Sequence, residues 1–200
     1  MRFQSGQKQQ SLLKGLSYSM VFQVIGKALG YIRYLLIAYY FGVSRGLDLY
    51  YVAYGMVLST VFSITGLFDQ ILVPRLIQLK HQESDLSFSK LCGSFFSLSW
   101  VVSFFLLGLF YFLLPFIELI FAHGFSSVDR IELRRLTNYF IPWIIMSLPL
   151  GTLLAVFKCV RQFHVVFITD LIISLSATVG LIVWHSSPQS LAMVMSLGTL

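Results

Sequence analysis

Long apolar runs alternate with short polar breaks along almost the whole chain. Because about 20 apolar residues span a bilayer as a helix, this pattern predicts membrane-spanning helices rather than a β-barrel. We expect Pro115 to end the third helix, and Pro142 and Pro149 to interrupt the fourth. The six helices expected have the approximate ranges 12–41, 49–79, 91–114, 136–157, 165–184 and 189–200.

The polar breaks hold most of the charged residues. Residues 80–90 form a charged linker that is a candidate for a short surface helix. The longer connection, 118–135, is expected to contain an amphipathic turn with Ile131, Leu133 and Leu136 on one side. With the N-terminus inside, 8 basic residues lie inside and 4 outside, and the other 2 of the 14 fall within the membrane. This bias favours a cytoplasmic N-terminus.

Composition supports the same class of protein. The chain is 57% hydrophobic and 11% charged, against roughly 25% charged residues in soluble domains. The net charge of +6 is spread over the loops, so it does not indicate nucleic-acid binding. Cys92 and Cys159 lie far apart, and no metal-ligand spacing or nucleophile–base pair stands out. We therefore expect an all-α polytopic membrane protein with no cofactor, no metal site and no enzymatic chemistry.

The first apolar run contains two cations, Lys27 and Arg33, beside Gly26 and Gly30. On a helix, Arg33 shares a face with the glycines and Ile37, while Lys27 lies about a quarter-turn away. A charge at the membrane centre costs about 2.5–3.5 kcal/mol, so such residues usually face a wet cavity or the bundle interior. The pair predicts an anion site, with Arg33 as a forked donor and Lys27 as a point charge. Snorkelling to the interface is the alternative.

Asp48 follows the first helix by a tight turn. It can cap the second helix, or it can pair with one of the cations of the first. In the second helix, Asp69 is a candidate to pair with a cation, to bind a coupling ion or to lie at the cytoplasmic interface. Beside it runs a stripe of small and polar residues, which indicates helix packing or, alternatively, a cavity lining that includes Ser59, Ser63, Asp69 and Gln70. The stripe consists of Gly55, Ser59, Ser63, Gly66 and Gln70.

Seven short segments, in this order, resemble the MurJ/MviN family of lipid II flippases, part of the multidrug/oligosaccharidyl-lipid/polysaccharide exporter superfamily. They are residues 26–33, 37–42, 48–53, 66–74, 121–125, 140–142 and 160–163. The resemblance implies a bundle of 14 helices in two lobes, of which these 200 residues would be the N-terminal lobe. It also implies that Lys27, Arg33 and Asp48 match the family's two helix 1 cations and the acid after them.

The implied function is export of a lipid-linked sugar diphosphate from the inner to the outer face of the bacterial inner membrane, by alternating access. Membrane lipids are implied partners. The chain is expected to be truncated and to need its missing C-terminal lobe or a partner chain.

The chain departs from the family where members often carry an arginine pair, here Thr60 and Val61, and an acid, here Thr65. Three alternatives therefore stay open: a flippase for another undecaprenyl-linked glycan such as O-antigen or exopolysaccharide, a drug or cation antiporter of the same superfamily, and a non-functional fragment.

Overall fold

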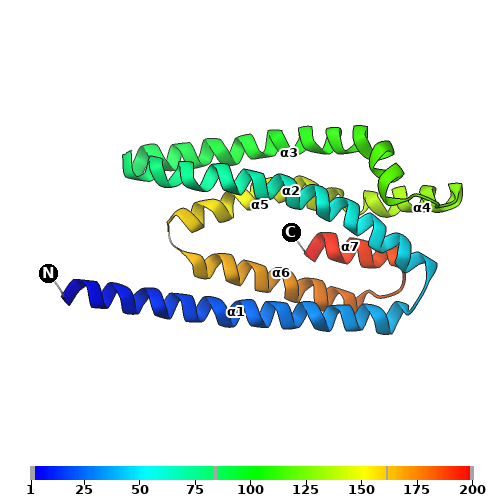
Figure 1. Ribbon diagram of the computed structural model, residues 1–200, viewed down its shortest axis with the longest axis horizontal. Helices are drawn as coiled ribbons and strands as arrows, with labels where there is room; N and C mark the ends of the chain where they lie inside the picture. Colours follow the sequence, from blue (N-terminus) through cyan, green and yellow to red (C-terminus); the bar gives the residue numbers. More distant parts are fainter. Residues whose placement is uncertain (1–2, 83–84, 161, 199–200) are drawn as a thin grey trace.

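The fold, given by a computed structural model, is described for residues 3–82, 85–160 and 162–198 (Figure 1). Within these ranges the regular secondary structure is entirely helical. The helices are α1 (Phe3–Phe41), α2 (Arg45–Gln82), α3 (Asp85–Phe121), α4 (Ser127–Asn138), α5 (Ile141–Cys159), α6 (Phe163–Val183) and α7 (Pro188–Gly198).

Five candidate membrane spans are long and apolar enough to cross a bilayer, and α4 with α5 counts as one of them. The prediction of an all-helical, multi-span membrane protein is confirmed. The last expected helix, 189–200, corresponds to α7, which has 11 residues from Pro188 to Gly198, and residues 199–200 are outside the described ranges.

Two predictions about proline are wrong. Pro115 does not end its helix, because α3 continues to Phe121, and Figure 1 shows the end of α3 turning toward α4. A membrane helix tolerates the missing amide hydrogen of proline where neighbouring groups satisfy the freed carbonyl. The expected helix 136–157 is instead broken at Tyr139 and Phe140, and Pro142 lies in the first turn of α5, where its missing amide costs nothing. Pro149 does not interrupt the helix either, because α5 continues past it to Cys159.

α4 replaces the predicted amphipathic turn. It begins with a capping box, in which the hydroxyl of Ser126 accepts from the amide of Asp129 and the carboxylate of Asp129 accepts from the amide of Ser126. Leu133 and Leu136 are fully buried, as expected, but Ile131 is 70% exposed. Residues 131 and 133 are about 200° apart on a helix, so they cannot share a side.

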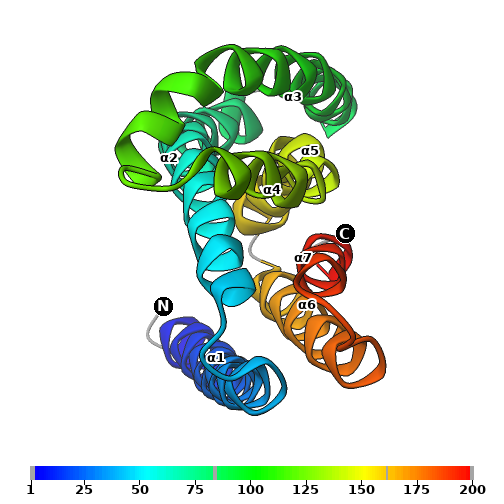
Figure 2. The same ribbon diagram turned by 90° about the vertical axis from the view of Figure 1, so that its right-hand side faces the viewer.

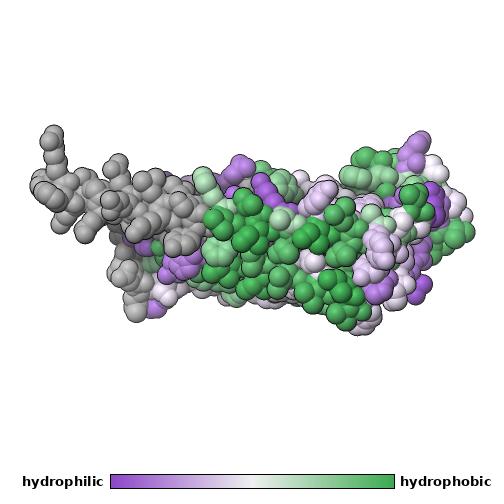
Figure 3. Space-filling view, turned by 90° about the horizontal axis from the view of Figure 1, so that it is seen from below, coloured by the Kyte–Doolittle hydropathy of each residue, from purple (hydrophilic) through white to green (hydrophobic). Residues whose placement is uncertain are grey.

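The helices form two groups, which the end-on view separates (Figure 2). α1 packs along α6, and α6 packs on α7, while α2, α3, α4 and α5 pack on one another. Seen from the side of α1 and α6, the middle of the molecule is apolar and hydrophilic residues gather toward the end that holds the turns (Figure 3). This is the surface expected of helices that face lipid.

Two apolar clusters form the core. The larger contains Tyr50 and Phe140, which join α2 to the start of α5, and it continues into the first group through Ile37 of α1, Leu181 of α6 and Leu191 of α7. The smaller joins the far end of α2 to α3 and α5, and includes the buried thiol of Cys159. Both clusters contain α2, so α2 is the common support for the residues described next.

Candidate anion-binding site

α1 turns its glycine face toward the protein. Gly26, Gly30 and Arg33 are half-buried and Ile37 is 1% exposed, whereas Lys27 is exposed. The Oγ of Ser174 on α6 donates to the carbonyl of Gly26 at 3.4 Å. A Cβ atom at Gly26 or Gly30 would meet nothing within 4 Å, so the two glycines leave space instead of forming a tight helix contact.

Arg33 stands at the border between the two helix groups. Its Nε is buried and has no hydrogen-bond partner among the described residues. Its charge interacts electrostatically with Tyr50 and Tyr54 on α2. The guanidinium therefore has at least one donor available. Lys27 lies about 9 Å from Arg33 along α1, toward the N-terminus, and its side chain is exposed.

An aromatic cluster backs this position. Tyr50 and Tyr54 are stacked with ring centroids 5.9 Å apart, and Tyr54 stacks on Trp143 of α5 at 5.7 Å. Phe140 contacts all three rings, with centroid distances of 6.2, 6.0 and 6.1 Å. Tyr50 and Tyr54 lie one helical turn apart, which is why they present their rings on the same face of α2.

Asp48 does not meet the cations of α1. It is exposed in the first turn of α2, and its charge interacts with that of Arg45 three residues earlier. The cap is formed by Ser44, whose Oγ accepts from the amide of Leu47 at 3.3 Å. Asp48 is thus an acid near the positive end of the helix dipole, not its cap.

A groove of about 250 Å³ runs along α2 away from the aromatic cluster. Trp143 lines it, and Lys158 Nζ and Asp69 Oδ2 form an ion pair in it at 2.6 Å. Of the four residues predicted to line a cavity, only Asp69 does so here, since Ser59, Ser63 and Gln70 are exposed elsewhere on α2. The other lining residues are Val61, Thr65, Met146, Ser147, Leu150, Gly151, Leu154 and Ile173.

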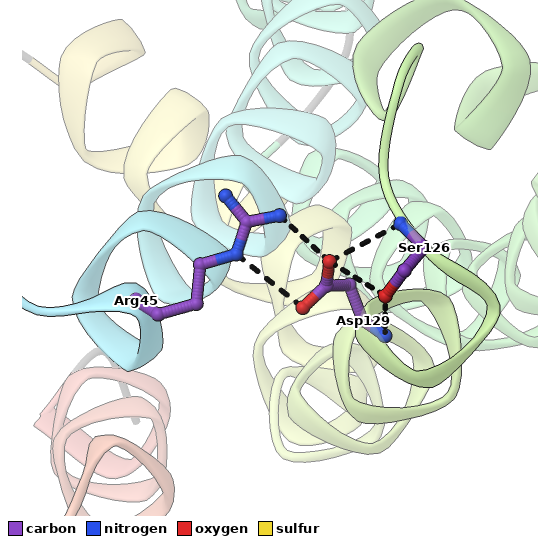
Figure 4. A network of polar contacts seen from close by, with 3 residues as sticks. All are labelled: Arg45, Ser126 and Asp129. Carbon is purple, nitrogen blue, oxygen red and sulfur yellow. Dashed lines mark hydrogen bonds and ion pairs between the residues drawn. The ribbon is translucent and has the colours of Figure 1, made fainter.

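A second charged cluster ties the α1–α2 turn to α4 (Figure 4). Arg45 donates to both carboxylate oxygens of Asp129, at 3.3 and 2.6 Å, and its guanidinium lies 4.7 Å from the ring centroid of Phe125. The same carboxylate is held by the Ser126 cap. Among the described residues, no group of three His, Cys, Asp or Glu side chains is placed to hold a metal ion.

The Lys158–Asp69 pair allows a test of how α2 is held to α5. We expect Asp69→Asn to lower the free energy of unfolding by about 1–2 kcal/mol. The substitution leaves Lys158, whose side chain is 31% exposed, without its charged partner. The change should be smaller when Lys158→Met is added, as a double-mutant cycle in mixed micelles would measure. The neighbouring exposed residue provides the control, since Gln70→Ala should change stability by less than about 0.5 kcal/mol. Additive effects of the two substitutions would contradict a coupled pair.

Comparison with known proteins gives one match. The family model described as "Lipid II flippase MurJ" matches residues 37–200. No curated protein and no solved structure matched the chain. The matched region begins at the end of α1 and includes the tyrosines of α2, the groove and the Arg45–Asp129 cluster. Because it covers well over half of the sequence, the chain belongs to the MurJ lipid II flippase family.

Proposed function

We propose that this chain forms the N-terminal lobe of a flippase that moves a lipid-linked peptidoglycan precursor of the lipid II type from the inner to the outer face of the bacterial inner membrane. The family and the five apolar spans support a membrane transport role. The observation that carries the proposal is Arg33, a membrane cation whose buried Nε lacks a partner in the described part of the chain. A charge kept in that state is matched by an anion brought by a substrate.

The diphosphate of the substrate is the group that Arg33 recognises. A guanidinium donates in a planar fork that fits phosphate oxygens, and Lys27 adds a point charge on the same helix. The open space over Gly26 and Gly30 gives the head group room beside the α1 backbone. The lipid tail stays in the bilayer, and rocking of this lobe against the C-terminal lobe or a partner chain exposes the head group on the other side. The N-terminus is cytoplasmic in this scheme.

Asp48 contributes indirectly. In this state it lies beside Arg45, whose guanidinium holds the start of α4 through Asp129. We assign Asp48 to the shape of the α1–α2 turn, which sets where Arg33 stands relative to α2.

A second candidate substrate is another undecaprenyl-linked glycan. Val61 and Thr65 line the groove at positions where family members often carry charges. Both are uncharged here, and the hydroxyl of Thr65 donates a hydrogen bond to the carbonyl of Val61 at 2.8 Å. The absence of charge at these two positions favours a head group that differs from that of lipid II. Cation export is less well supported, because Asp69, the carboxylate in the groove, is already paired with Lys158.

The test is complementation with the full product of the gene in a bacterium depleted of its own lipid II flippase. We expect Arg33→Ala to reduce the rate at which lipid II reaches the outer face by roughly 10–100-fold. This is the loss expected when one hydrogen bond to a charged group, with a free energy of about 1.5–3 kcal/mol, is removed. The transport rate of Arg33→Lys should fall between those of the parent and of Arg33→Ala, because lysine keeps the charge and loses the forked hydrogen-bond donors of the guanidinium.

Arg130→Ala, at an exposed arginine of α4, is the matched control and should leave transport unchanged. If Arg33→Ala transported lipid II at the rate of the parent protein, the role given to Arg33 would be refuted. Transport of O-antigen or exopolysaccharide precursors, with no transport of lipid II, would select the second substrate.

A further inference from the structure

The hydroxyl of Tyr50 is a buried polar group with no assigned use. Tyr50 is 1% exposed, and its hydroxyl has no hydrogen-bond partner within the described ranges. An unsatisfied buried hydroxyl costs about 1–3 kcal/mol, and a phenylalanine would avoid this cost with the same ring. The ring alone therefore does not account for a tyrosine at this position.

Tyr50 and Arg33 lie in the same part of the molecule. Ile37, one turn beyond Arg33 on the same face of α1, packs in the same apolar core as Tyr50. The charge of Arg33 also interacts electrostatically with the Tyr50 side chain. Tyr34 and Tyr51, their neighbours in the sequence, are 51% and 39% exposed.

Both unpaired groups are donors that need an acceptor. The Nε of Arg33 can only donate, and a phenol donates through its O–H. A single ligand that presents several acceptor oxygens would satisfy both, as a phosphate group does.

None of the carboxylates whose side chains the structure describes serves this purpose. Asp48 lies two residues from Tyr50, about 200° around α2. The other placed acids have partners elsewhere or lie by Lys158: Asp69 bonds to Lys158, Glu118 to Arg134, Asp129 to Arg45 and Glu132 to Gln189, and Asp170 interacts with Lys158. The acceptor must therefore come from outside this part of the chain.

We infer that the Tyr50 hydroxyl and the Arg33 guanidinium together bind the phosphoryl oxygens of a lipid-linked diphosphate. This inference rests on the proposed function and extends it to a second ligand residue on α2. Tyr54, Trp143 and Phe140 hold the Tyr50 ring in place, so the hydroxyl is positioned before the ligand arrives. The tyrosine supplies a donor on a helix that lacks the arginines often found there in the family.

The variant Tyr50→Phe tests the inference, because it removes one oxygen atom and keeps the ring. Binding is measured on the full gene product in nanodiscs, with undecaprenyl diphosphate as the probe. We expect Tyr50→Phe to weaken binding about 5–30-fold, and the melting temperature of the ligand-free protein to stay the same or rise. Tyr39→Phe, at an α1 tyrosine that is 82% exposed, is the matched control and should bind like the parent.

The outcomes separate the two proposals. If Tyr50→Phe binds like the parent while Arg33→Ala does not, Tyr50 is a structural residue and this inference fails alone. If neither variant changes binding or flipping, the proposed function fails as well.

Two further arms identify the source of the phosphate. Tyr50-dependent binding of inorganic pyrophosphate at equal affinity would support the same donor pair with a soluble ligand. Tyr50-dependent competition by phosphatidylglycerol nanodiscs, against phosphatidylcholine nanodiscs, would support the donor pair with a membrane phospholipid. Loss of affinity for undecaprenyl diphosphate alone supports the lipid-linked substrate.

Discussion

Replacing Phe140 by alanine is expected to lower the free energy of unfolding by about 3–5 kcal/mol. Phe140 has no exposed surface and contacts Tyr50, Tyr54 and Trp143. Its removal leaves a cavity between α2 and the start of α5, where the broken helix has little freedom to collapse. Because the same cavity loosens the Tyr50 ring, we also expect weaker ligand binding.

Unfolding of the purified protein in mixed micelles, followed by circular dichroism during titration with sodium dodecyl sulfate, measures the loss. Phe112→Ala provides the control, since Phe112 is 74% exposed on the lipid side of α3 and should lose less than about 1 kcal/mol. Equal losses at the two positions would show that protein packing at Phe140 contributes no more than contact with lipid does at Phe112.

Replacing Arg134 by alanine is expected to cost about 2–4 kcal/mol. Arg134 donates to both oxygens of Glu118, at 2.7 and 2.8 Å, and Glu118 is 4% exposed. The substitution leaves a buried carboxylate without its partner at the point where the end of α3 meets α4. The larger part of the cost is the desolvation of that carboxylate, not the loss of attraction at the surface.

A second variant isolates this cause. Glu118→Gln in the Arg134→Ala background removes the charge that was left unpaired, so part of the lost stability should return. Stability that is equally low in the double variant would point to lost packing of the arginine stem instead.

The spans were predictable from the sequence, but the ends of the helices were less so. A run of apolar residues is a strong signal, because the bilayer imposes one length on every span. Pro115 and the break at Tyr139 depend on which neighbours satisfy a freed carbonyl, and the chain order does not show this. Ser44, just before α2, is a residue type preferred at helix starts, so this cap could have been predicted from the sequence.

The candidate site also has features that the sequence predicts and features that it does not. The helical projection separated Arg33 from Lys27, and the structure places the first half-buried and the second exposed. The pair Lys158 and Asp69 joins residues 89 positions apart, a separation that no local pattern reveals. Tyr50 and Tyr54 recur at helical spacing in the sequence, but the unsatisfied hydroxyl of Tyr50 is visible only once the helices are packed.

The packing of α1 on α6 has a thermodynamic consequence for the site. Arg33 stands on α1, which packs along α6, whereas Tyr50 stands on α2, which packs on α5. The separation of the two donors is then a direct measure of how the groups are tilted. A diphosphate that bonds to both favours the tilt at which both reach it, and by linkage any force that changes the tilt changes the affinity by the same free energy. Under the proposed function, a change of this tilt is then sufficient to release the substrate, with no change in either side chain.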